Sequence, residues 1–215
     1  MSQYDLFSAG RSKYSSLDEL FDEMKHMKDD PLANAGTNVV ISRGNPLAKL
    51  LIIGEAPGPE ENIKGKPFVG RAGQLLDKIL QSAEFDPEKD VFITNSVFRL
   101  PPGEDGKAFR KPTTEEIEYY RPFVFEIVRF IDPVIMLLTG NVACQSILGK
   151  TGITNLRGKW TEMDERWVMP IFHPSYLLRN PSRDPGSPKA LMWEDMKNVR
   201  KKYDELMKKK KSNQN

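Results

Sequence analysis

Short apolar runs alternate with amphipathic stretches along the chain, and this alternation predicts its secondary structure. Consecutive apolar residues predict buried strands at 50–54, 91–94, 133–140 and 166–172. Apolar residues at helical spacing, in places behind a Ser or Thr cap, predict helices at 16–27, 72–85, 113–131, 141–149 and 187–211. Because strands and helices take turns, we expect a mainly parallel sheet with helices on both faces.

The pattern predicts a single domain. The 215 residues suit one core of ordinary size, and no internal repeat or interdomain linker interrupts the alternation. We therefore expect one domain over residues 1–215, with an N-terminal helical extension at about 1–36 and a basic C-terminal tail at about 205–215.

Three loops with polar and turn-forming residues each follow a predicted strand, at 54–73, 95–112 and 173–180. In open α/β sheets, ligands bind outside the carboxyl ends of the strands. We therefore expect the three loops to converge at one edge of the sheet and to form the functional site there.

Composition narrows the class of protein. Hydrophobic residues make up 39% of the chain and the net charge is +2, which is typical of a globular protein and neither demands nor excludes nucleic acid. No apolar run is long enough to span a membrane, and the N-terminus lacks the apolar stretch of a secretory signal. We expect a cytoplasmic protein, associated with the nucleoid if the source is a bacterium.

A single cysteine, Cys144, limits the metal chemistry that the chain supports. One thiol cannot form an internal disulfide, and it cannot by itself build a cysteine-ligated zinc or iron–sulfur site. A metal-dependent nuclease is not favoured either, because no convincing set of ligands stands out.

The segment 200–211 carries seven basic residues against two acidic ones. Such a run is typical of a solvated helix end. An electrostatic aid to DNA binding is the alternative interpretation.

Three motifs, each behind a predicted strand, occur in a characteristic order: GEAPGPEENIKGKPFVGRAGQLLD at 54–77, ITNSVFRLPPG at 93–103 and HPSYLLRN at 173–180. Together they resemble the uracil-DNA glycosylase superfamily, and its family 4 most closely, from about Thr37 to Leu191. The resemblance implies a three-layer α/β/α sandwich around a central four-stranded, mainly parallel sheet. It also implies hydrolysis of the bond between uracil and deoxyribose in DNA, without metal-based chemistry.

The resemblance implies four positions that bind a base flipped out of DNA. The ring of Phe68 stacks on the pyrimidine, a contact worth about 1–3 kcal/mol per base. The amide of Asn95 both donates and accepts, so it matches the uracil edge at O4 and N3. Glu61 falls near the pyrimidine C5 edge, where it would exclude the methyl group of thymine, and the backbone around Ala56 contacts base or sugar. In the alternative readings Phe68 is a core residue, Asn95 caps a turn and Glu61 is an exposed acid.

Three further residues are implied to act on the bond. His173 donates a hydrogen bond to uracil O2 as negative charge develops there. Glu55 positions the attacking water or favours the cationic sugar. Glu104 follows the PPG sequence at a place where the family has an Asn near that water. It either takes over the water-positioning role or marks a changed substrate.

The same resemblance implies a set of residues that contact the DNA backbone or support flipping. Leu177 is the preferred wedge into the space that the extruded base leaves. Ser175 and loop amides hold phosphates, while arginines add positive charge. The residues assigned to DNA binding are Gly70, Arg71, Ser175, Tyr176, Leu177 and Arg179.

Family 4 enzymes usually carry a four-cysteine iron–sulfur cluster, and here the chain departs from the family. The flanking motifs place the four cysteine positions near Met27, Asp30, Arg99 and Tyr120. None of these is cysteine, so we expect no cluster and no other cofactor. Packing by Phe98, Tyr119 and Tyr120 would then replace the cluster as a link between segments.

Two alternatives to a uracil-DNA glycosylase remain open. The first is a glycosylase for another deaminated or modified base, including bases of modified phage DNA, and Glu104 leaves room for it. The second is a non-catalytic DNA- or base-binding protein of the same fold, against which Phe68, Asn95 and His173 argue. In each case the expected partner is DNA, single- or double-stranded, and the expected state is a monomer.

Overall fold

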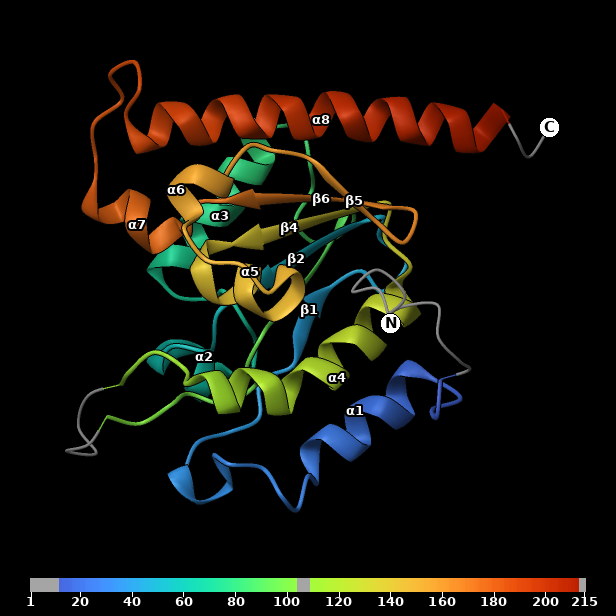
Figure 1. The fold of residues 1–215 in the computed structure, drawn as a ribbon, viewed down its shortest axis with the longest axis vertical. Coiled ribbons are helices and arrows are strands. Elements are labelled where there is room, and N and C mark those ends of the chain that lie inside the picture. The colour runs from blue at the N-terminus through green and yellow to red at the C-terminus, as the bar shows by residue number, and fades with distance from the viewer. Residues whose placement is uncertain (1–11, 104–108, 213–215) are drawn as a thin grey trace.

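The computed structural model describes residues 12–103 and 109–212. In these ranges six strands form one mixed sheet in the order β1-β3-β2-β4-β6-β5 (Figure 1). The four inner strands, β3 (Val91–Asn95), β2 (Leu50–Gly54), β4 (Ile135–Thr139) and β6 (Arg166–Ile171), are all parallel. This confirms the four-stranded parallel centre that the apolar runs predict.

Two short edge strands were not predicted. β1 (Ser42–Gly44) pairs antiparallel with β3, and β5 (Thr161–Met163) pairs antiparallel with β6. Each has only three residues; those of β1 are all half-buried, whereas β5 has one half-buried, one exposed and one buried residue. A segment so short has no apolar run or clear alternation to mark it.

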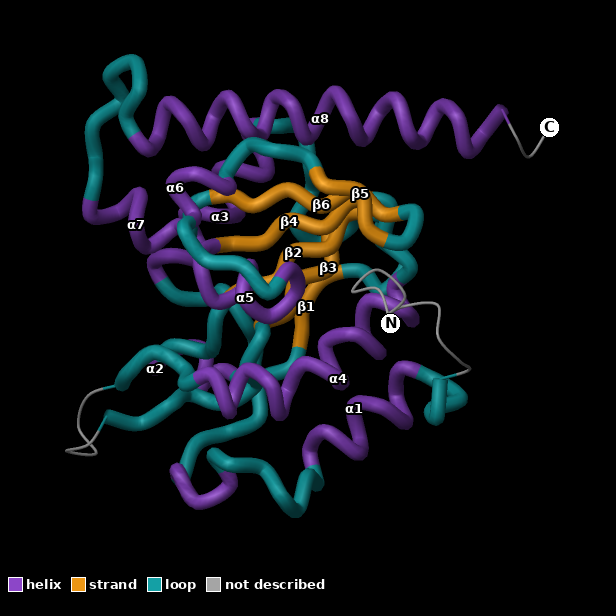
Figure 2. The backbone as a smooth tube through the Cα atoms, in the orientation of Figure 1, coloured by secondary structure: helices purple, strands orange, loops and turns teal. Residues whose placement is uncertain are grey.

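Alternate residues of the sheet face two separate hydrophobic layers, as the pleat requires. Leu51 and Ile53 of β2 pack toward α1 (Leu17–Lys25), α4 (Thr114–Ile131) and α5 (Gly140–Leu148). Leu50 and Ile52 pack toward α3 (Arg71–Ser82), α7 (Pro174–Arg179) and α8 (Pro188–Ser212). Figure 2 shows the sheet between these two groups of helices. The protein is therefore a three-layer α/β/α sandwich, as expected.

Three short helices lie outside the segments predicted as helices. They are η1 (Ala33–Ala35), α2 (Pro59–Lys64) and α6 (Ile153–Leu156). The third expected loop, 173–180, is largely the helix α7.

The lysine-rich end of α8 lies away from the carboxyl ends of the parallel strands. α8 begins near α7 and runs across the sheet, so that its C-terminal turns extend beyond the opposite edge (Figure 1). The basic tail is thus not part of the edge at which the three loops were expected. None of the helices in the described ranges is long and apolar enough to cross a membrane.

A buried polar network joins the segment after α1 to the rest of the core. The carboxylate of Asp30 is fully buried and accepts hydrogen bonds from Arg99 Nε at 2.5 Å, from the Leu32 amide at 2.9 Å and from the Tyr120 hydroxyl. Arg99 also donates to the carbonyl of Thr37. One carboxylate therefore connects the N-terminal segment, the loop after β3 and α4.

This network occupies three of the four positions at which family 4 cysteines were expected. The fourth, Met27, is partly buried and packs on the same core cluster. The expected aromatic packing is also present, because the Tyr120 ring makes edge contacts with Phe98 at 5.5 Å and Tyr119 at 5.1 Å between ring centroids. The link between the segments is nevertheless mainly polar.

We predict that Asp30→Ala lowers the free energy of unfolding by about 3–5 kcal/mol, because it leaves the Arg99 guanidinium and the Tyr120 hydroxyl buried without their partner. Urea denaturation of both proteins measures the difference. The exposed Asp22→Ala is the matched control, with an expected change of about 0.5 kcal/mol or less. Equal unfolding midpoints for Asp30→Ala and wild type would contradict the structural role of the network.

Candidate active site

The three expected loops meet at the carboxyl ends of the parallel strands and line one cleft of about 820 Å³. The first loop contributes Glu55, Ala56 and Phe68, the second Asn95, and the third His173. The parallel strand β4 also leads into this cleft. The helix α5 follows β4 directly, and Gln145 and its neighbours in α5 form part of the wall. No function was predicted for α5, although it directly follows the carboxyl end of β4, where ligands bind in such sheets.

The floor of the cleft is built from the ends of β2 and β3. Gly54 and Asn95 are partners in the parallel register. A Cβ atom on Gly54 would lie 2.2 Å from Asn95 Oδ1 and 2.5 Å from the Phe68 ring. Gly54 is therefore required so that amide and ring can both approach the backbone.

Asn95 is the residue that most clearly indicates a ligand-binding site. Its side chain is 1% exposed, and its Oδ1 has no hydrogen-bond partner among the described residues. A buried, unpaired amide oxygen costs about 1–3 kcal/mol. Since Asn95 lines the cleft, the atom is suited to accept an N–H from a bound ligand.

Phe68 forms a flat apolar wall beside the amide. Its ring centroid lies 5.8 Å from that of His173, with 33° between the planes. Its backbone has φ of 52°, the left-handed region that costs a non-glycine residue roughly 1–2 kcal/mol. Surrounding contacts must therefore hold this residue in place.

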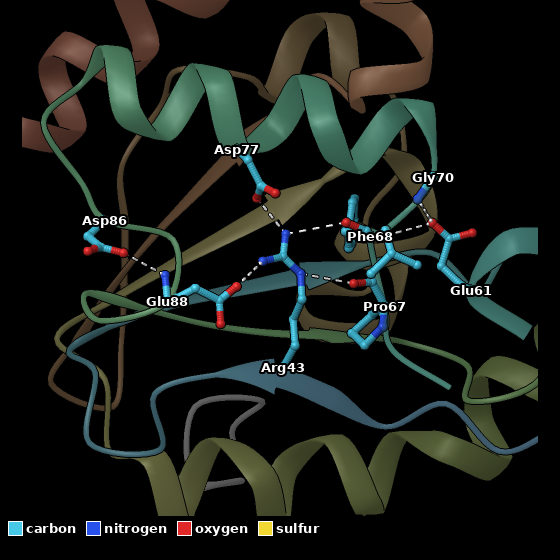
Figure 3. A network of polar contacts seen from close by, with 9 residues as sticks. Arg43, Glu61, Pro67, Phe68, Gly70, Asp77, Asp86 and Glu88 are labelled. Carbon is cyan, nitrogen blue, oxygen red and sulfur yellow. Dashed lines mark hydrogen bonds and ion pairs between the residues drawn. The ribbon is translucent and has the colours of Figure 1, made fainter. Parts of the chain in front are cut away.

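Glu61 provides some of those contacts. Its carboxylate accepts hydrogen bonds from the amides of Gly58 at 3.1 Å, Val69 at 3.0 Å and Gly70 at 2.8 Å. Figure 3 shows the part of this arrangement around Gly70. Glu61 thus organises the first loop, a role that sequence analysis missed. Its place at the C5 edge of a pyrimidine remains a prediction.

His173 is held as a neutral hydrogen-bond donor. It caps α7, where its Nδ1 accepts the amide of Ser175 at 3.2 Å and lies 2.7 Å from the Ser175 hydroxyl. With Nδ1 as acceptor, the proton of the neutral ring is on Nε2. Burial, and to a lesser extent the positive charge of Arg179, lower the pKa of His173 to about 4. At neutral pH the ring therefore offers an N–H without a net charge.

The pKa of Glu55 is shifted in the opposite direction from that of His173. Burial raises the pKa of its carboxyl group, while the positive charges of Lys111 and Arg179 lower it. All three residues line the cleft. Lys111 was not predicted as a site residue. The sequence shows the loop that carries it, but it does not show that this loop lies close to Glu55. Glu104 lies outside the described residues.

Two of the residues assigned to DNA contact are engaged elsewhere. Leu177 is 1% exposed and packs in the core with α3 and α8, so the expectation that it is the wedge is wrong for this arrangement. Its neighbours Tyr176 and Leu178 are 38% and 37% exposed. The amide of Gly70 donates to Glu61 and is not free to bind a phosphate.

The other assigned residues leave an exposed, basic rim. Arg71, at the start of α3, and Arg179, at the end of α7, are exposed. Ser175 lines the cleft, and its hydroxyl contacts His173. Among the residues that the structure describes, no group of three or more His, Cys, Asp or Glu side chains is arranged to hold a metal ion.

Comparison with known proteins agrees with this architecture. The model of the uracil DNA glycosylase superfamily matches residues 41–197. The chain belongs to the uracil-DNA glycosylase superfamily.

Relatives within the family include proteins named type-4 uracil-DNA glycosylase. The chain is 38% identical to that of Thermotoga maritima, over 72% of this chain and 79% of the relative. It is 36% identical to that of Archaeoglobus fulgidus, over 77% and 85%, and 33% identical to that of Sulfurisphaera tokodaii, over 86% and 84%.

We predict that the imidazole of His173 titrates with a midpoint of about 4, because burial disfavours its charged form. The unfolded chain binds this proton at about 6.5, so folding is weakened as the pH falls from 6.5 toward 4 and is unaffected by this group above 6.5. An NMR titration of the two histidine rings measures the midpoint, with a His26→Gln variant to assign the signals. A His173 midpoint near 6.5 would contradict the desolvated site.

Proposed function

We propose that the protein is a monofunctional DNA glycosylase that hydrolyses the N-glycosidic bond of uracil in DNA and leaves an abasic site, as a step of base excision repair. One observation carries the proposal: the buried, unpaired Oδ1 of Asn95 beside the Phe68 ring. Uracil presents an N3–H that this oxygen accepts. Cytosine presents a lone pair at N3, which would leave two acceptors facing each other.

The neutral His173 suits the departure of the base. When the bond between C1′ of the sugar and N1 of the base breaks, the electron pair leaves with uracil and its charge is shared with O2. The N–H on Nε2 of His173 then stabilises that oxygen through a hydrogen bond that strengthens as the charge develops. A neutral imidazole fits this step because it donates a hydrogen bond to the base without transferring its proton when the bond begins to break.

The sugar is left as an oxocarbenium-like cation and is captured by water. The oxygen of water bonds to C1′, and one proton of that water passes to solvent or base. The partly desolvated carboxylate of Glu55 is placed in the same cleft to hold the water or to stabilise the cation. Glu104 is proposed as a second water-positioning group, on the basis of its sequence position alone.

DNA is the proposed partner, and the protein acts on it as a monomer. The exposed Arg71 and Arg179 are suited to bind phosphates. With Leu177 buried, Tyr176 and Leu178 are the apolar side chains of α7 that are exposed enough to enter the duplex. Because its substrate is DNA, we also propose a cytoplasmic location, associated with the nucleoid if the source is a bacterium.

We predict that the wild-type protein makes alkali-sensitive breaks at uracil in labelled oligonucleotides, single-stranded or with G or A opposite. Asn95→Ala and His173→Ala should lower the single-turnover rate by about 100- to 1000-fold, since each removes a donor or acceptor aimed at the leaving base. His26→Ala, which changes the other histidine on the exposed side of α1, is the control and keeps the rate.

Parallel oligonucleotides with thymine, hypoxanthine and a hydroxymethylated pyrimidine separate the alternatives. Breaks at one of these bases and none at uracil would overturn the uracil specificity but keep the mechanism. DNA binding without breaks at any base would overturn the enzyme and favour a binding protein.

We also propose that the protein holds no iron–sulfur cluster. The positions that would supply thiolates carry Met27, Asp30, Arg99 and Tyr120, and Asp30 already forms charge-assisted bonds there. Thiolates are the ligands that such clusters need, and this residue set does not fit them.

We predict that pure protein contains no stoichiometric iron and no visible absorption band, and that it stays folded in a strong iron chelator. Iron at four atoms per chain would contradict the proposal.

A further inference from the structure

Arg43 lies outside the three motifs, yet its side chain reaches the loop that carries Phe68 (Figure 3). It belongs to the edge strand β1, opposite Ile93 of β3, and its side chain is 7% exposed. The guanidinium donates to two backbone carbonyls, with Nε 3.0 Å from the oxygen of Pro67 and Nη2 3.3 Å from that of Phe68.

Two carboxylates fix the orientation of this guanidinium. Nη2 lies 2.5 Å from Asp77 Oδ1 on α3, and Nη1 lies 3.2 Å from Glu88 Oε1. The side chain of Asp77 is 33% exposed, whereas that of Glu88 is 72% exposed, so the pair with Asp77 is screened less by solvent. Asp77 therefore anchors Arg43, and the contact with Glu88 adds little.

The Phe68 segment is consequently held from two sides. Arg43 binds the carbonyls of residues 67 and 68, while Glu61 binds the amides of Val69 and Gly70. Between these two sets of bonds lies the residue with φ of 52°. A backbone conformation of this kind persists only where neighbouring contacts maintain it.

We propose that Arg43 is a positioning residue for base binding, which holds the carbonyls of Pro67 and Phe68 and so keeps the Phe68 ring on the wall of the cleft. Its consequence for catalysis rests on the proposed function, because the ring matters only if a base stacks on it. Arg43 itself touches neither base nor sugar and acts through the loop.

The planar fork of arginine is needed for this arrangement. One guanidinium reaches two successive carbonyls and a carboxylate at the same time, with donors in fixed directions. A lysine in the same place has one ammonium group and cannot match all three acceptors. Arg43→Lys is therefore an informative variant, because it keeps the charge and loses the geometry.

The first measurement is inhibition of uracil cleavage by free uracil, which reports the pocket without the DNA backbone. We expect Arg43→Gln to weaken free-uracil binding about tenfold, within the range of one lost stacking contact. Arg43→Lys should fall between Arg43→Gln and wild type. Asp77→Asn, which loosens the anchor and leaves Arg43 unchanged, should weaken binding by roughly threefold. Glu88→Gln is the control and keeps the wild-type affinity.

The same substitutions are made in a Phe68→Ala background. If Arg43 acts through the ring, Arg43→Gln has no further effect on uracil affinity once the ring is gone. An equal loss in both backgrounds would overturn the proposal, because a general loss of stability does not depend on Phe68. Wild-type affinity in Arg43→Gln would overturn it as well.

Amide hydrogen exchange separates this proposal from the proposed function. Arg43→Gln should speed exchange at Val69 and Gly70 and leave the strand β4 protected, whereas Glu88→Gln should change neither. If the wild-type protein does not cleave DNA at uracil, the proposed function fails. If Arg43→Gln still speeds exchange at these two amides, the positioning of the loop by Arg43 stands. Unchanged exchange at both amides would overturn the role of Arg43.

Discussion

The parallel register of β2 with β3 is the constraint on which the site depends. It sets Gly54 beside Asn95, so that an amide and an aromatic ring share the space above one glycine. The amide oxygen of Asn95 is left there without a hydrogen-bond partner among the residues that the structure describes. Such an atom lowers stability in the free protein, and it becomes useful when a ligand arrives with the matching donor.

Burial shifts the pKa values of His173 and Glu55, two ionisable groups of the cleft, in opposite directions. Removal of water keeps His173 neutral and makes the charged form of Glu55 less favourable. The nearby charges of Lys111 and Arg179 favour the carboxylate again. An uncharged imidazole and a carboxyl group with a raised pKa therefore line the same cleft.

Much of the fold could be predicted from the sequence, because strands that are buried on both faces of a sheet appear as short, continuous apolar runs. The convergence of Phe68, Asn95 and His173 followed from the rule that strand ends form the site. The burial of Leu177 could not be predicted, since it depends on partners in α3 and α8. The use of the Gly70 amide could not be predicted because the sequence does not show which loop carboxylate it meets. Arg43 was not predicted as a site residue because it lies on a three-residue edge strand outside the three motifs, and its partners Pro67 and Phe68 are 24 and 25 residues away in sequence.

The network of Asp30, Arg99 and Tyr120 has a consequence for how the protein matures. Its donors and acceptors are all part of the polypeptide, so this junction forms as soon as the chain has folded. It requires no inorganic sulfide, no delivery by an assembly machinery and no reducing surroundings to preserve it. The formation of this junction therefore does not depend on the iron supply or the redox state of the cell.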